Sequence, residues 1–166
     1  YARLDERLAA LPGVEYAGMA SRLPLTQNGY NQNPLYPEDD AATYATKIPP
    51  LQLYTTVDGD YFKAMGIPLV AGRTFDRLES QSATDAIINR KTATQFWQDS
   101  TGRRALGKRF RSLPQGPLYT VVGVVGDTRE PFRANAGAVT LTPAAPACGP
   151  HCRRRRPHGA AFIFSR

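Results

Sequence analysis

The run from Leu118 to Val125 constrains the fold of this chain more than any other segment. Its sequence, Leu-Tyr-Thr-Val-Val-Gly-Val-Val, is rich in β-branched residues and shows no alternation of polar with apolar positions. Such a run is typical of a strand that is buried on both faces. We therefore expect it to form the centre of a sheet.

The segments before this run show strand and helix patterns in turn. Leucines at positions 4, 8 and 11 share one face of a predicted amphipathic helix, which Pro12-Gly13 would end. Residues 26–46 are rich in Asn, Gln, Pro and Asp, a composition that predicts a long exposed loop. Further strands are predicted over 14–20, 51–57, 85–89 and 108–110, and further helices over 61–65 and 90–97. This order predicts an α+β fold, with a small mixed sheet and packed helices.

The 166 residues are the length of one domain, and their net charge of +7 is distributed unevenly. Residues 1–130 carry 15 Lys and Arg against 14 Asp and Glu, whereas residues 131–166 carry six Arg and no acidic residue. A nucleic-acid-binding domain is expected to have a basic stripe on its folded surface. Because the body of this chain is electrostatically balanced, its charge predicts no nucleic-acid partner.

Residues 131–166 differ from the body in composition as well as in charge. Eight of these 36 residues are Ala and five are Pro, so the segment cannot bury enough apolar surface to offset the entropy of ordering it. We predict that this tail is disordered, apart from the short apolar segment from Ala160 to Phe164. The abrupt change after Glu130 suggests the hypothesis of a shifted reading frame in GC-rich DNA.

One segment is similar to a phosphate-binding loop but lacks two of its features. In Gly102-Arg-Arg-Ala-Leu-Gly107-Lys108, Arg109 stands where the pattern needs Ser or Thr, and no buried strand precedes the first glycine. We interpret the segment as a turn before a short strand. A nucleotide cofactor is not expected.

A second motif near the C-terminus contains residue types that ligate zinc. Cys148, His151, Cys152 and His158 are close in sequence, but the proline- and arginine-rich segments around them offer no scaffold for a closed site. An accidental pair, or a local disulfide in an oxidising compartment, explains them better. We expect no metal site.

Two carboxylates, Asp58 and Asp60, could form an acid/base pair, because paired carboxylates can share proton transfer. Carboxylates at the start of a helix also cap its free amides, and we favour that interpretation. The body contains no His and no Cys. We therefore expect no catalytic residue and no cofactor.

Several short motifs follow one another in a specific order through residues 1–130. They are Leu8-Ala-Ala-Leu-Pro-Gly-Val14-Glu, Ser21-Arg-Leu-Pro-Leu25, Asp60-Tyr-Phe-Lys-Ala-Met-Gly-Ile-Pro-Leu-Val-Ala-Gly-Arg73-Thr-Phe, Ala86-Ile-Ile-Asn89, Ala93-Thr-Gln-Phe-Trp97, Leu106-Gly-Lys-Arg-Phe110 and Tyr119-Thr-Val-Val-Gly-Val-Val-Gly-Asp127. Together they resemble the MacB-like periplasmic core domain of ABC transporter permeases of the MacB/FtsX type. The resemblance ends after Asp127, so we expect the domain over 1–130 to be incomplete.

The resemblance implies a domain inserted between the first two transmembrane helices of an inner-membrane permease, on the periplasmic side. It implies a mechanical role, in which the domain moves with those helices while a nucleotide-binding domain, fused or separate, hydrolyses ATP in the cytoplasm. The expected partners are the rest of the permease chain, a second permease copy and a periplasmic adaptor protein. The chain begins with Tyr1 and shows neither a signal peptide nor a membrane-spanning run, so we expect a fragment.

Certain residues of these motifs are expected to shape the fold rather than to perform chemistry. Glycine and proline would form the turns, Arg73 would form an ion pair or bracket carbonyl groups, and two aromatic rings would pack the second helix on the sheet. The complete set is Gly66, Pro68, Gly72, Arg73, Phe75, Asn89, Phe96, Trp97, Gly107, Gly123 and Asp127.

Two other functions remain as alternatives. One is an independent soluble binding module, in which Arg153–Arg156 of the basic tail contact nucleic acid or an anionic membrane. Deletion of residues 131–166 would abolish a salt-sensitive binding only in such a module. The other alternative is a small enzyme that uses Asp58 and Asp60, which Asp58→Asn would inactivate.

Overall fold

The computed structural model describes residues 7–8, 10–21, 31–75, 84–127, 138–141 and 160–165, the last two segments by their backbone alone. In chain order the elements are β1 (Val14–Ala20), β2 (Asn31–Pro34), β3 (Tyr36–Pro37), the 3₁₀ helix η1 (Glu38–Asp40), β4 (Leu51–Gly59), α2 (Tyr61–Ala64), β5 (Leu69–Gly72), β6 (Asp85–Asn89), α3 (Arg90–Trp97), β7 (Arg109–Arg111), β8 (Leu118–Val125), β9 (Ala138–Leu141) and β10 (Ala160–Ser165). The predicted α+β class is confirmed. No helix of the described segments is long and apolar enough to cross a membrane.

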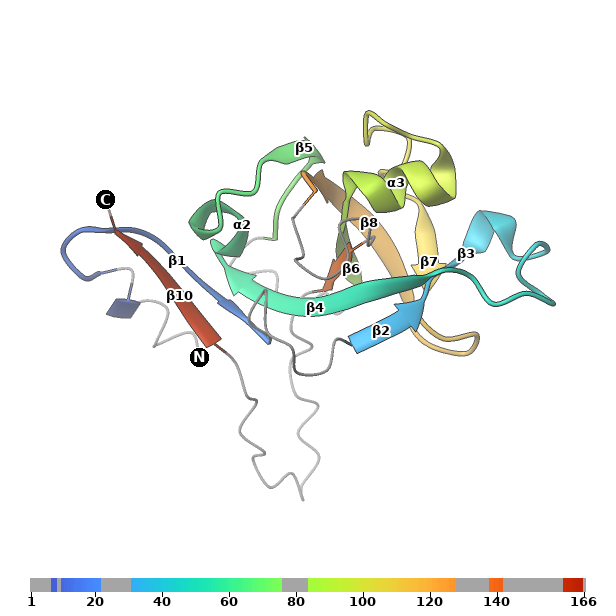
Figure 1. Cartoon of the computed structure of the whole chain (residues 1–166), viewed down its shortest axis with the longest axis horizontal. Helices are drawn as coiled ribbons and strands as arrows, with labels where there is room; N and C mark the ends of the chain where they lie inside the picture. The colour runs from blue at the N-terminus through green and yellow to red at the C-terminus, as the bar shows by residue number, and fades with distance from the viewer. Residues whose placement is uncertain are drawn as a thin grey trace, which may run out of the picture.

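The strands form a mixed sheet in the order β10-β1-β4-β9-β6-β8-β7-β3, with β2 on β4 and β5 on β8. Two neighbouring pairs, β4 with β9 and β6 with β8, are parallel. The other pairs are antiparallel. Figure 1 shows β1 and β10 as a ribbon at one end of the molecule and β7, β8 and α3 toward the other end.

The central strand β8 has neighbours on both edges and packs on both faces. β6 pairs with one edge, while β5 and β7 pair with the other. Val121 and Val124 join the buried cluster beside α3, together with Ile88. Val125 joins the cluster around α2, together with Ile87. The neighbouring isoleucines of β6 divide between the clusters because successive strand residues point to opposite faces. The prediction of a strand buried on both faces is confirmed.

Helix α3 has the predicted bounds, 90–97, and clear signals at both ends. At its start the Asn89 side chain accepts a hydrogen bond from the Thr92 amide at 3.0 Å, which satisfies one free helix amide. The Asp127 carboxylate accepts a second, from the Lys91 amide at 2.9 Å. Gln98 ends the helix in the left-handed conformation, with φ of 51°.

Helix α2 is one turn long and ends at Gly66, whose φ of +64° favours glycine. Asp60 occupies the N-cap position, but its side chain makes no capping hydrogen bond. Its carboxylate instead pairs with the Lys63 ammonium at 2.9 Å. Asp60 therefore lies at the start of the helix as predicted, but the prediction that its side chain caps the helix amides is wrong. The side chain of Asp58 lies outside the described residues.

The prediction of a long exposed loop over 26–46 is wrong for its middle part. β2 pairs with β4, and β3 pairs with β7, so residues 31–34 and 36–37 belong to the sheet. Leu35 and Pro37 are buried. Backbone pairing with two longer strands outweighs the polar composition that suggested a loop, because sheet pairing needs backbone groups rather than apolar side chains.

The prediction of a disordered tail is wrong for residues 138–141, which form β9, whereas the apolar segment that was excepted from that prediction forms β10. β9 lies between β4 and β6, and β10 pairs with β1. The open edges of β4 and β6 accept a strand whatever its side-chain composition, since unpaired edges are strong templates for pairing. The other tail residues lie outside the described part of the chain. So does half of the predicted helix 4–11, of which Arg7 and Leu8 are helical and Ala10 and Leu11 form a turn and a bend.

Candidate functional site

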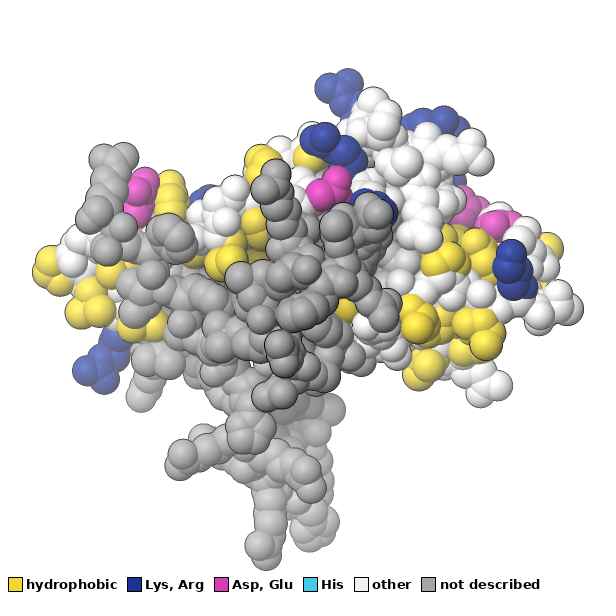
Figure 2. All heavy atoms as spheres, viewed as in Figure 1, with side chains coloured by type: hydrophobic (Ala, Val, Ile, Leu, Met, Phe, Trp, Pro, Cys, Tyr) yellow, Lys and Arg dark blue, Asp and Glu magenta, His cyan; other side chains and the backbone are white. Residues whose placement is uncertain are grey.

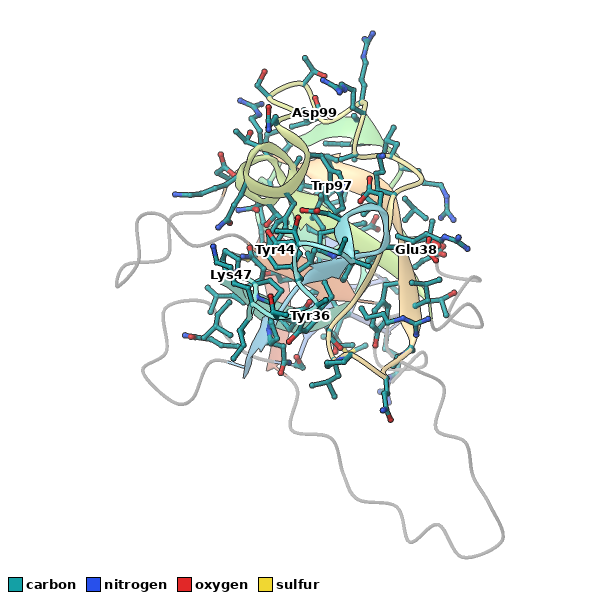
Figure 3. The ribbon with its side chains drawn as sticks, turned by 90° about the vertical axis from the view of Figure 1, so that its right-hand side faces the viewer. Tyr36, Glu38, Tyr44, Lys47, Trp97 and Asp99 are labelled. Carbon is teal, nitrogen blue, oxygen red and sulfur yellow. The ribbon has the colours of Figure 1, made fainter. Side chains whose placement is uncertain are left out.

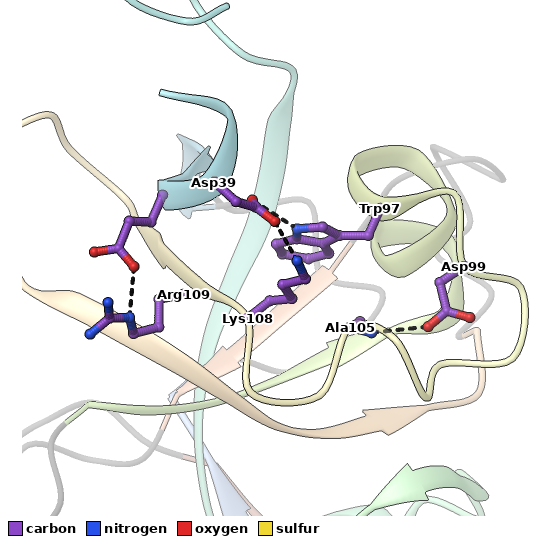
Figure 4. A network of polar contacts seen from close by, with 7 residues as sticks. Asp39, Trp97, Asp99, Ala105, Lys108 and Arg109 are labelled. Carbon is purple, nitrogen blue, oxygen red and sulfur yellow. Dashed lines mark hydrogen bonds and ion pairs between the residues drawn. The ribbon is translucent and has the colours of Figure 1, made fainter. Parts of the chain in front are cut away.

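A cluster of polar side chains joins three segments that are far apart in the sequence (Figure 4). Asp39 of η1 accepts a hydrogen bond from Trp97 Nε1 of α3 at 3.2 Å and forms an ion pair with Lys108 Nζ at 2.6 Å. Beside it, Glu38 pairs with Arg109 Nε of β7 at 2.7 Å. We call these five residues the Asp39 cluster. It fastens η1 to α3 and β7 from outside the core.

A second carboxylate, Asp99, organises the loop from 98 to 108, which we call the Asp99 loop. Its side chain is buried and accepts hydrogen bonds from the Thr101 amide and hydroxyl at 3.0 and 2.7 Å. It also accepts from the amides of Arg104 at 2.6 Å and Ala105 at 3.0 Å. Burial would raise the pKa of Asp99, but these hydrogen bonds outweigh burial and lower it.

This arrangement explains the segment that is similar to a phosphate-binding loop. A phosphate would need the free amides of such a loop and the ammonium group of its lysine. Here the amides of Arg104 and Ala105 bind the Asp99 carboxylate, and Lys108 binds Asp39. Gly107 has a φ of +75° and its amide donates to the Val121 carbonyl at 2.8 Å. The interpretation as a turn before a short strand is confirmed.

The predicted residues around Arg73 lie together where β5 meets β8. Arg73 pairs with Asp85 at 2.8 Å, which confirms the expected ion pair. A side chain at Gly72 would collide with the Val122 carbonyl, and Gly72 has a φ of +77°. A side chain at Gly123 would collide with the Arg73 carbonyl. Both glycines are therefore required by close backbone approach.

The remaining predicted residues lie in the core or at the ends of elements. Phe75 packs at the edge of the cluster around α2, with its ring centre 6.5 Å from that of Phe62. The rings of Phe96 and Trp97 are 6.0 Å apart, and both contact the cluster beside α3. The Pro68 carbonyl accepts from the Gly126 amide at 2.8 Å.

A buried polar contact connects α3 with β4. The Thr92 hydroxyl lies 2.8 Å from Asn89 Oδ1 and 3.1 Å from Gln52 Oε1, and all three residues are buried. The Gln52 amide group also donates to Gln95 Oε1 at 3.3 Å. A buried polar group costs free energy unless it is paired, so these contacts fix the helix in one position on the sheet.

An open cavity of about 530 Å³ lies beside η1. Tyr36, Tyr44, Ile48 and Pro114 provide apolar walls, and Lys47 stands at the same cavity. Figure 3 shows Tyr36, Tyr44 and Lys47 on one side of the molecule.

The acid/base pair of Asp58 with Asp60 is not tested by the described residues, because the Asp58 side chain lies outside them. No group of three or more His, Cys, Asp or Glu side chains there is arranged to hold a metal ion. Asp60 is paired with Lys63. The Cys and His residues of the C-terminal motif, and Arg153–Arg156, lie outside the described residues.

Asp39 and Asp99, which organise the two polar sites, were not predicted from the sequence. Asp99 had a recognisable signal, because Asp followed by Ser, Thr and Gly after a helix is typical of a side chain that binds nearby backbone amides. Asp39 had none, since its partners Trp97 and Lys108 are distant in sequence and the pairing depends on the fold.

The chain matches the family model of the MacB-like periplasmic core domain over residues 2–154. No curated protein matches it. The match extends beyond residue 130 and includes β9.

Several solved structures share its fold. One is a domain of a protein described as a permease from Porphyromonas gingivalis, with 20% identity, a TM-score of 0.59, and coverage of 95% of this chain and 64% of that one. Another is the extracellular domain of the noncanonic ABC-type transporter YknZ from Gram-positive bacteria. It has 16% identity and a TM-score of 0.53, and the alignment covers 84% of this chain and 60% of that one. A third is the periplasmic region of MacB from Actinobacillus actinomycetemcomitans. It has 14% identity and a TM-score of 0.56, and the alignment covers 98% of this chain and 64% of that one. The chain spans less than two thirds of each of these structures.

Proposed function

The chain belongs to the family of MacB-like periplasmic core domains of ABC transporter permeases, and we propose that it transmits conformational change between transmembrane helices and periplasmic partners or substrate. In this proposal the domain lies outside the cytoplasm and performs no chemistry of its own. Its partners are the rest of its permease chain, a second permease copy, an ABC nucleotide-binding domain and a periplasmic adaptor. The observation that carries the proposal is the family match over residues 2–154.

The internal contacts of the body support a mechanical role. Transmission of movement requires that segments far apart in the sequence move together. The Asp39 cluster joins residues 38–39 to residues 97 and 108–109, and the ion pair of Arg73 with Asp85 joins β5 to β6. Interiors that are packed and fully paired deform little and pass strain on to their neighbours. We propose that the predicted motif residues, Gly72, Arg73 and Gly123 among them, serve this rigidity.

The test separates transport from ATP hydrolysis in the permease that carries this domain. Asp99→Asn keeps the size of the side chain but weakens its hydrogen bonds to the loop amides, whereas Asp40→Asn changes an η1 carboxylate that contacts no partner among the described residues. Both permeases are reconstituted with their nucleotide-binding domain in vesicles. We expect Asp99→Asn to lower transport while basal ATP hydrolysis is kept, and Asp40→Asn to change neither.

Hydrogen exchange of the same vesicles reports whether Asp99→Asn has loosened its loop. Faster exchange with a wild-type rate of transport would contradict the proposal, because a loosened body would then still transmit movement. Equal loss of transport and of basal hydrolysis would also contradict it.

The alternative of a basic binding module needs a sharper test than deletion of residues 131–166. That deletion would remove β9, which lies between β4 and β6, and would disturb the fold itself. Changing all four arginines at 153–156 to Gln leaves β9 in place. Loss of salt-sensitive binding to DNA or to anionic vesicles would favour the module, whereas unchanged transport and no such binding would favour the permease domain.

A further inference from the structure

We propose that the cavity beside η1 binds an amphipathic organic anion, a molecule with a flat apolar body of one or two rings and one carboxylate or sulfonate group. The cavity volume of about 530 Å³ lies within the range of roughly 300 to 1,000 Å³ that is usual for small-molecule sites. The inference goes beyond the proposed role in transmission and does not depend on it.

The walls of the cavity favour a flat apolar body. Tyr36 and Tyr44 line it with aromatic rings, and Pro114 adds rigid apolar surface. The Ile48 side chain also lines it and is 74% exposed, an unusual position for a large aliphatic group. A ring system in the cavity would cover Ile48 and stack against tyrosine at a low cost in side-chain entropy.

The charges at the cavity favour an anion. Glu38 is the acidic residue among the lining residues, and it is already paired with Arg109 at 2.7 Å. Lys47 has no hydrogen-bond or ion-pair partner among the described residues. Arg111 donates one hydrogen bond, to the Gly116 carbonyl, and its other donors have no partner in the described part of the chain. Two uncompensated cations thus face the cavity.

The neighbouring carboxylates do not cancel this charge. Asp39 already forms an ion pair with Lys108 at 2.6 Å, within the Asp39 cluster. Asp40 is the remaining acidic residue of η1, and it does not line the cavity. A ligand anion would therefore meet Lys47 and Arg111 first, and charge-assisted hydrogen bonds to such groups are about twice as strong as neutral ones.

The probe is 8-anilinonaphthalene-1-sulfonate, which combines two aromatic units with a sulfonate and fluoresces when it is bound in an apolar site. It is titrated into the 166-residue chain, in parallel with the neutral analogue N-phenyl-1-naphthylamine. We expect the sulfonate to bind at least about tenfold more tightly than the neutral analogue, because the latter cannot pair with the cations. Equal affinity of the two probes would overturn the proposal.

Two matched pairs of variants locate the binding. Lys47→Gln should weaken sulfonate binding roughly tenfold, while Lys63→Gln, the same change on α2, should leave it within twofold. Ala45→Trp places a large ring at a lining residue and should abolish binding, whereas Ala42→Trp lies in the same segment but outside the lining. Circular dichroism confirms that each variant is folded. If the two members of either pair behave alike, the probe binds elsewhere and the proposal is wrong.

Discussion

The two segments that flank the Asp39 cluster, the Asp99 loop and residues 41–48, have opposite organisation. The Asp99 loop turns inward, because a buried carboxylate gathers the amides of residues 101, 104 and 105. The segment 41–48 turns outward, with Ile48 exposed and Lys47 unpaired among the described residues. Figure 2 shows yellow apolar groups on the surface at this end of the molecule. One buried acceptor thus decides whether a polar segment becomes part of the core or part of the surface.

The largest effect is expected from removal of that acceptor. Asp99→Ala leaves several donors without a partner, and each buried unsatisfied donor costs about 1 to 3 kcal/mol, so the free energy of unfolding should fall by about 3 kcal/mol or more. The measurement is urea denaturation followed by circular dichroism. Asp40→Ala, in the outward segment, should change stability by less than about 0.5 kcal/mol. Similar losses of unfolding free energy in both variants would contradict the contrast between the Asp99 loop and residues 41–48.

A smaller effect is expected from a methyl group at the tightest point of the Asp99 loop. Gly102 has a φ of +77°, and a Cβ there would approach the Val124 side chain to 2.9 Å. Gly102→Ala should therefore cost about 2 kcal/mol, from left-handed strain together with overpacking. Gly66→Ala, with a φ of +64° and no atom near the added methyl, is the control and should cost about 1 kcal/mol. Thermal unfolding of the two variants separates crowding from strain.

Acidification should lower the stability of the chain through the Asp99 carboxylate, whose pKa differs between the folded and the unfolded chain. The pKa of Asp99 in the folded chain is lower than its usual value of about 3.9, so the unfolded chain binds the proton more readily. Its stabilising contribution is complete above that usual value and is lost as the pH falls through the folded pKa. Unfolding free energies measured from pH 6 down to pH 2 should decline in the wild type. Asp99→Asn should flatten that decline, and an unchanged slope would contradict the assignment.

The smallest effect on stability is expected from two lysines, of which Lys108 is paired and Lys47 has no partner among the described residues. Lys108 pairs with Asp39 at 2.6 Å, but its side chain is 41% exposed, so Lys108→Met should cost no more than about 1 kcal/mol. Lys47→Met, in the outward segment, removes no contact within the described residues and should leave stability unchanged. High salt should reduce the difference between the variants, since it screens the exposed pair. Chemical denaturation at low and high salt measures this.

The elements that could be predicted from sequence are those whose signals are local. β8 was recognisable from its apolar run, and α3 from the helical propensity of residues 90–97 and from the spacing of Ala93, Phe96 and Trp97. The α+β class and the family followed from such segments. β2 and β3 were not recognisable, because their residues are polar and their partners, β4 and β7, are distant in sequence.

The candidate sites were less predictable than the fold for the same physical reason. An ion pair was one of the two roles predicted for Arg73, yet its partner Asp85 is known only from the pairing of both β5 and β6 with β8. The cavity beside η1 depends on how the segment 41–48 folds back toward β7, and no motif marks that path. A surface site of this kind is created by topology, and residue types alone do not show it.

The position of β9 has a consequence for the order in which the chain can fold. β4 and β6 lie earlier in the sequence, yet they are joined through a strand that begins at residue 138. During synthesis the middle of the sheet must therefore wait for residues 138–141, while the hydrophobic clusters around α2 and α3 are already complete in sequence. Late closure of distant contacts slows folding, because loop-closure entropy must be overcome first. A nascent chain halted before that point would expose two strand edges at its centre, and these edges are where we expect chaperones to bind first.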